Sequence, residues 1–288
     1  MVEHLQVGKG HIAYELTGEG PLVVLAHGMG DSRHSYRFVV PPLVAAGYRV
    51  ANVDLRGCGD SSSVWPSWER TDLAADLVAV VRHLGGPAVV VGQSISGGAA
   101  TIAAATAPDV VVGVVELAPF TRKQSPSLRG LLTDRRHRRA TIQLAKVLLS
   151  GNLNGWLSYL DLAYPSKPTD WDTEHNRIES ALARPERMAA LRAMMKTSPA
   201  DAGDQLPNVT CPVLVVEGSA DPDWADPAAE GRKVVDDLPP GLGEVAVIDG
   251  AGHYPHAEAP DAVLELVLPF LGRTLTPTTP TINPTHDA

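Results

Sequence analysis

The chain has 288 residues, a formal net charge of −9 and a hydrophobic fraction of 44%. This composition is typical of a soluble globular protein with a sizeable core, and its acidic balance argues against a nucleic-acid partner. The N-terminus lacks a basic region followed by an apolar run, and no stretch reaches the ~18 uninterrupted apolar residues of a membrane helix, so we expect a cytoplasmic protein without signal peptide or membrane span.

Short Val-rich apolar runs recur along the chain, and most of them end in Gly, Asp or Ser. They cover residues 22–26, 48–53, 88–91, 110–117, 213–216 and 245–248. Continuous apolar runs of this length are typical of parallel strands buried on both faces. Two earlier segments, 3–7 and 11–16, alternate more, and they predict an antiparallel hairpin about residues 8–10.

Helical patterns separate these runs, at residues 71–84, 95–107, 226–238 and 260–271. In the first of them, apolar residues recur every three or four positions, as on the buried side of a helix. Strands that alternate with helices predict an α/β fold, here a mostly parallel eight-stranded sheet with helices on both faces.

Residues 120–206 break this alternation, because they contain helical segments and no convincing strand. A structureless loop of this length is rare, so we expect a helical cap insertion at 120–206 in a core formed by residues 1–119 and 207–272. The remaining segment, 273–288, is rich in Pro and Thr, and we expect it to be disordered.

The strongest chemical pattern lies where a Val-rich run ends, at Gly92-Gln93-Ser94-Ile95-Ser96. A serine at the apex of a tight strand-to-helix turn is exposed at the N-terminus of a helix. The N–H of Ile95 would stabilise an oxyanion there. The alternative, a phosphate-binding loop, lacks a following Lys and the required glycine spacing.

An acid and a histidine follow later strands. Asp221 comes just after the run 213–216, at the sheet edge where sites gather in open α/β folds. Asp223 and Asp226 compete with it, although each could cap the following helix, and Glu116 is a further substitute inside an apolar run.

His253 lies in a glycine-bounded loop after the last run. A zinc site on His253 and His256 would need a third ligand and a helical spacing, which Pro255 opposes. We therefore expect His256 to be structural, as we do His27.

Together these segments resemble the α/β-hydrolase family. The Ser94 turn resembles its Gly-x-Ser-x-Gly nucleophile elbow, with Ser96 in place of the second Gly, and residues 250–258 resemble its Gly-x-Gly-His-x-Pro-His-x-Glu loop. The resemblance implies a catalytic triad of Ser94, Asp221 and His253 in that chain order. It also implies an oxyanion hole formed by the backbone N–H of Met29 together with that of Ile95.

This resemblance implies a serine hydrolase that acts on a small-molecule ester, lactone or thioester without cofactor or metal. Family members that open epoxides use a carboxylate nucleophile, so Ser94 argues against that activity. A carbon–carbon bond hydrolase, a cofactor-free perhydrolase and a small-molecule receptor stay open as alternatives. Trp156, Tyr159 and Met194 are our candidates for the substrate pocket. Cys58 is expected to be a packed residue rather than a nucleophile.

Overall fold

The computed structural model describes residues 1–123 and 128–275. Eight strands form one sheet in the order β1-β2-β4-β3-β5-β6-β7-β8. The strands are β1 (Val2–Val7), β2 (Gly10–Thr17), β3 (Leu22–Ala26), β4 (Arg49–Val53), β5 (Ala88–Gln93), β6 (Val111–Leu117), β7 (Val213–Gly218) and β8 (Gly243–Ile248). The predicted hairpin is confirmed, since β1 and β2 pair antiparallel with Val7 opposite Gly10.

From β4 onward the sheet is parallel, as the continuous apolar runs predict. Every residue of β3, β5 and β7 is buried, because helices cover both faces of these central strands. The expectation is wrong for β8, where Val245 and Val247 are 37% and 43% exposed. This strand lies at the edge of the sheet, where less of its surface is covered.

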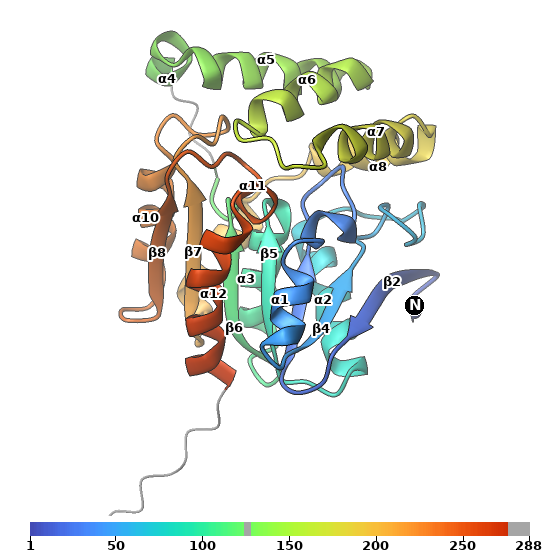
Figure 1. The fold of residues 1–288 in the computed structure, drawn as a ribbon, viewed down its shortest axis with the longest axis vertical. Helices are drawn as coiled ribbons and strands as arrows, with labels where there is room; N and C mark the ends of the chain where they lie inside the picture. Colours follow the sequence, from blue (N-terminus) through green and yellow to red (C-terminus); the bar gives the residue numbers. More distant parts are fainter. Residues whose placement is uncertain (124–127, 276–288) are drawn as a thin grey trace, which may run out of the picture.

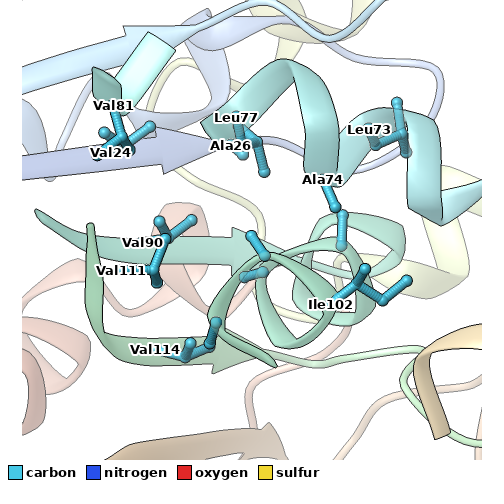
Figure 2. Packing of buried hydrophobic residues seen from close by; sticks show 14 of the residues in the cluster. Val24, Ala26, Leu73, Ala74, Leu77, Val81, Val90, Ile102, Val111 and Val114 are labelled. Carbon is cyan, nitrogen blue, oxygen red and sulfur yellow. The ribbon is translucent and has the colours of Figure 1, made fainter. Parts of the chain in front are cut away.

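Helices pack against both faces of the sheet (Figure 1). One face carries α2 (Arg70–His83), α3 (Ile95–Thr106) and α10 (Pro227–Asp236), and the other carries α1 (Val40–Ala45) and α12 (Pro260–Leu275). Figure 2 shows the first of these interfaces, where Leu73 and Leu77 of α2 and Ile102 of α3 belong to one buried cluster with Val side chains of the sheet. The mostly parallel α/β architecture predicted from the sequence is therefore confirmed.

Between β6 and β7 the described residues form helices and no strand. These are α4 (Leu128–Thr133), α5 (Arg135–Ser150), α6 (Leu153–Ala163), α7 (Trp171–Leu182), α8 (Pro185–Met194), α9 (Ala200–Gly203) and the one-turn η2 (Leu206–Asn208). Helices α5 to α8 lie across one end of the sheet (Figure 1). Their buried side chains form a hydrophobic cluster of their own, which Tyr254 and Ala257 join from the chain after β8.

Helix α12 continues to Leu275, so residues 273–275 are helical rather than part of the disordered tail that we expected. The rest of that tail, 276–288, lies outside the described residues. Within residues 1–123 and 128–275, no helix combines the length and the apolar character needed to cross a bilayer.

Candidate active site

Ser94 occupies the turn between β5 and α3, with φ 55° and ψ −119°. A positive φ is strained for a residue with a Cβ, and such strain gathers at functional sites. The turn is so tight that a Cβ at Gly92 would lie 2.1 Å from the carbonyl oxygen of Ser96. Glycine at position 92 is therefore a steric requirement, and the turn presents Ser94 at the N-terminus of α3.

Ser96 stands where the elbow that this turn resembles usually has a second glycine, and its side chain makes a defined contact. It is fully buried, and its hydroxyl donates a hydrogen bond to the carbonyl oxygen of His27 over 2.6 Å. Serine instead of glycine at position 96 thus links the Ser94 turn to the loop after β3. The sequence identified Ser96 only as a small residue, because the bond depends on two strands being neighbours.

His253 and Asp221 form a buried pair in which Nδ1 lies 2.8 Å from Oδ2. The backbone N–H of His253 donates to Ala163 at the end of α6, and its carbonyl accepts from the Gln93 side chain. The backbone of His253 is thereby held between the helical insertion and the Ser94 turn. Burial alone would lower the pKa of His253, but the carboxylates of Asp221 and Asp223 outweigh it and raise the pKa to about 9.

Asp223 and Asp226, the two alternatives to Asp221 as the acid that pairs with the histidine, have different surroundings. Asp226 caps α10 through a 2.9 Å hydrogen bond from the N–H of Ala229, as the capping interpretation predicted. Asp223 is not the N-cap of that helix, so the capping alternative holds for Asp226 and not for Asp223. Its Oδ2 accepts from the Tyr159 hydroxyl at 2.7 Å and lies 3.5 Å from Nδ1 of His253. Burial raises the pKa of Asp223 to about 6, and the neighbouring charge of Asp221 also raises it.

Asp221, Asp223 and His253 also bring ligand-type atoms within 4.8 Å of one another, close enough to share a small cation. Two of these atoms already face each other in the His253–Asp221 contact, and the Tyr159 hydroxyl donates to Asp223. This pattern favours a hydrogen-bonded acid–histidine group. The absence of a metal stays a prediction.

The loop after β3 lies directly against the Ser94 turn. A Cβ at Gly28 would lie 2.0 Å from Oε1 of Gln93 and 3.2 Å from Cβ of Ser94. Met29 follows in this loop and lines the same cavity as Ser94, while Ile95 is the first residue of α3. The first N–H groups of a helix have no acceptor within the helix, so the N–H of Ile95 is free to bind an oxyanion. Both predicted oxyanion donors therefore lie on backbone segments next to Ser94.

His27 has the structural role expected of it. Its ring is fully buried, Nε2 accepts from the N–H of Leu55, and Nδ1 lies 2.7 Å from the carbonyl oxygen of Gly28. His256 is also buried, stacked on Tyr36, and burial lowers its pKa to about 3. Burial also lowers the pKa of His27, so both rings stay neutral at physiological pH.

Glu116 and Cys58 are both buried in the core. Glu116 is fully buried and accepts hydrogen bonds from the hydroxyls of Thr101 and Thr121 through one oxygen. Burial raises its pKa to about 7 against the effect of these bonds. Burial also raises the pKa of Cys58 to about 12, so its thiol stays protonated. These surroundings give Glu116 no contact with His253 and make Cys58 a poor nucleophile.

Ser94 and His253 line one cavity of ≈ 370 Å³ beneath the helical insertion. Its other lining residues are Met29, Arg70, Phe120, Lys123, Leu144, Trp156, Tyr159, Met194, Met195, Thr197, Ser198, Pro199, Asp223 and Tyr254. The three candidates Trp156, Tyr159 and Met194 are all among them, and their contact with substrate stays a prediction. Sequence reasoning missed Arg70, because nothing distinguishes it from the other charged residues at helix ends.

The chain matches known proteins along most of its length. Residues 23–266 match the model of the alpha/beta hydrolase family. A 2-(acetamidomethylene)succinate hydrolase of Mesorhizobium japonicum is 28% identical over 277 residues, which are 93% of this chain and 94% of that protein. A 2-hydroxy-6-oxononadienedioate/2-hydroxy-6-oxononatrienedioate hydrolase of Burkholderia vietnamiensis is 28% identical over 91% of each chain.

Solved structures agree with this relationship. A thermophilic esterase from Thermogutta terrifontis superimposes with a TM-score of 0.73 at 25% identity, covering 96% of this chain and all of that chain. A bromoperoxidase from Bacillus anthracis shares the fold, with a TM-score of 0.79 at 24% identity over 94% of this chain and 100% of that chain. The family model, the hydrolase relatives and the eight-stranded sheet together show that this chain belongs to the α/β hydrolase family.

Proposed function

We propose that this protein is a serine hydrolase that cleaves a carboxylic ester, lactone or thioester through an acyl-enzyme on Ser94. One observation carries the proposal: the strained Ser94 turn lines the same cavity as His253, which is paired with Asp221. Because Nδ1 of His253 is held by Asp221, Nε2 is the ring nitrogen left to accept a proton from Ser94.

In the first half-reaction, the Ser94 oxygen bonds to the carbonyl carbon while its proton moves to Nε2 of His253. The N–H groups of Met29 and Ile95 stabilise the oxyanion, each by about 3 kcal/mol by analogy with other oxyanion holes. The tetrahedral intermediate then expels the alcohol or thiol, which takes the proton from His253. Water repeats the sequence on the acyl-enzyme and releases the acid and free Ser94.

The helical insertion supplies much of the cavity wall, through Leu144, Trp156, Tyr159 and Met194. We therefore assign residues 120–206 as a cap that sets substrate size and polarity, above a core of residues 1–119 and 207–272. The bond between His253 and Ala163 ties this cap to the histidine loop.

A carbon–carbon bond hydrolase is the second candidate. The observation in its favour is the similarity to the 2-hydroxy-6-oxononadienedioate hydrolase, which extends over 91% of both chains. The same serine, histidine and acid would serve that reaction, with a carbanion equivalent as the leaving group. Turnover of a vinylogous diketone in preference to esters would identify this activity.

The test is hydrolysis of 4-nitrophenyl esters of increasing acyl length by the wild type, Ser94→Ala and Ser158→Ala. Ser158 is an exposed serine on α6 and serves as the matched control. We expect multiple turnover by the wild type and by Ser158→Ala, and loss of at least about 10³-fold in Ser94→Ala. Full activity in a folded Ser94→Ala variant would overturn the proposal.

A further inference from the structure

Arg70, the first residue of α2, is a buried cation in the wall of the candidate active site. Its side chain is only 2% exposed, yet it lines the cavity that holds Ser94 and His253. Arginine is rarely buried to this extent without a charged partner. The groups around the guanidinium therefore indicate whether its charged partner comes from the protein or from a bound substrate.

Among the described residues, the hydrogen-bond acceptors of this guanidinium are neutral. Its Nε donates to the carbonyl oxygen of Phe120 at 3.1 Å, and Nη1 donates to the Thr197 hydroxyl at 3.0 Å. Within residues 1–123 and 128–275, no carboxylate oxygen lies within 4.0 Å of it. Burial lowers the pKa of Arg70 to about 10 against the charges of Asp201 and Glu69, so it stays a cation at neutral pH.

The position of Arg70 relative to Ser94 follows from Gly98. A Cβ at this glycine would lie 2.9 Å from Cδ of Arg70, so the arginine stem crosses α3 where a side chain is missing. Gly98 comes four residues after Ser94, about one helical turn or 5–6 Å further along α3. A small substrate bound to Ser94 would therefore extend within reach of the guanidinium.

The cavity lining combines groups of different character. Ser94, His253 and Asp223 supply the proposed reactive groups, and Arg70, Lys123, Thr197 and Ser198 add cationic and hydroxyl groups to the same lining. Apolar side chains make up much of the remaining wall, among them Phe120, Trp156 and Met194. An occupant that fits this lining has a scissile carbonyl, an apolar part and an anionic group.

We propose that Arg70, assisted by Lys123, binds a carboxylate of the substrate, so that the natural substrates are acids that also carry the hydrolysable ester, lactone or thioester. This inference rests on the proposed serine-hydrolase function and adds the substrate class to it. A guanidinium edge can donate two parallel hydrogen bonds to a planar carboxylate, and these bonds gain strength in a cavity shielded from water.

The test compares anionic with neutral esters of matched length. The mono-4-nitrophenyl esters of adipic, pimelic and suberic acid are the anionic series, and the 4-nitrophenyl esters of hexanoic, heptanoic and octanoic acid are the neutral series. The readout is the ratio of kcat/KM for each pair. We expect the wild type to favour at least one anionic ester, and Arg70→Met to lower that ratio at least about tenfold, through KM.

Matched variants separate binding from stability. Arg82→Met makes the same substitution on the same helix at an exposed surface pair with Asp109, and should leave the ratio unchanged. Lys123→Ala changes an exposed side chain and should lower the ratio about threefold. Arg70→Lys keeps the charge and should recover part of the preference. Should Arg70→Met fail to fold, these last two variants carry the comparison.

A folded Arg70→Met variant whose ratio lies within twofold of the wild-type ratio would overturn the inference while leaving the serine mechanism intact. The proposed function fails separately if ester hydrolysis is absent or survives Ser94→Ala. In that case calorimetry with adipate decides the inference: Ser94→Ala should bind adipate, and Ser94→Ala/Arg70→Met should not. Equal adipate binding by both proteins would refute the carboxylate site.

Discussion

Oδ2 of Asp223 lies 3.5 Å from Nδ1 of His253, so the imidazole faces a second carboxylate besides Asp221. The two acids are joined by a 2.8 Å hydrogen bond from the N–H of Asp223 to Oδ1 of Asp221. In the proposed mechanism, the shorter contact makes Asp221 the orienting acid, and Asp223 would act through its charge. This relationship has a measurable consequence for the pH dependence of the reaction.

Replacing Asp223 with Asn should lower the pH at which the enzyme becomes active. A general base works only when unprotonated, so a His253 pKa of about 9 predicts kcat/KM that rises with pH up to that range. Removing a negative charge destabilises the imidazolium and should shift this limb downward by on the order of one unit. The measurement is a pH profile of 4-nitrophenyl ester hydrolysis. Asp226→Asn, which keeps a good helix cap, should leave the profile unmoved.

Replacing Asp221 with Asn should lower kcat by roughly 10³-fold, a much larger loss than we expect for Asp223→Asn. The reason is that an amide does not hold the imidazole in the working tautomer as a carboxylate does. Single-turnover kinetics with a 4-nitrophenyl ester would measure this loss at the acylation step. A decrease for Asp223→Asn as large as that for Asp221→Asn would show that the two acids had been assigned the wrong way round.

Replacing Ser96 with Ala should destabilise the fold by about 1 kcal/mol, because the buried hydroxyl donates to the His27 carbonyl. The free energy of unfolding from urea titration measures this loss, with Ser158→Ala as an exposed control. We also expect a lower kcat, since the same bond positions the loop that carries Met29. Unchanged stability and kcat in Ser96→Ala would mean that this hydrogen bond has no energetic role.

Gly92 tests the tight packing of the Ser94 turn, and Gly272 in helix α12 is its control. A Cβ at Gly92 would lie 2.1 Å from the backbone oxygen of Ser96, so Gly92→Ala should destabilise the protein by more than about 2 kcal/mol. A Cβ at Gly272 would meet no atom within 4 Å in helix α12, so Gly272→Ala should stabilise it by about 0.5–1 kcal/mol. Thermal unfolding should place the two variants on opposite sides of the wild type.

Glu116 should make the protein less stable as the pH rises from about 4.5 to 7. Its folded-state pKa of about 7 lies above the ordinary 4.5, so its stabilising effect is complete below pH 4.5 and is lost on approaching pH 7. The difference corresponds to about 3 kcal/mol. Glu116→Gln keeps an acceptor for Thr101 and Thr121 but cannot ionise, so its stability relative to the wild type should increase across this range in urea titrations.

Much of this protein could be predicted from sequence because the relevant physics is local. Continuous Val runs must be covered on both faces, and the runs that became β3, β5 and β7 are buried at every residue. Glycine and small residues around Ser94 specify a tight turn wherever it lies in the fold. The exposure of Val245 and Val247 was not predictable from their own run, because it depends on which strand ends the sheet.

The sequence by itself determined the α/β alternation, the helical character of the segment between β6 and β7, and the residue types needed for a serine mechanism. Only the tertiary structure decided which acids face His253 and that Arg70 lines the cavity beside Ser94. The physical reason is that burial and electrostatic partnership depend on distances between segments far apart in the chain. Asp223 and Arg70 acquire their surroundings from Tyr159, Phe120 and Thr197, and no local pattern encodes those contacts.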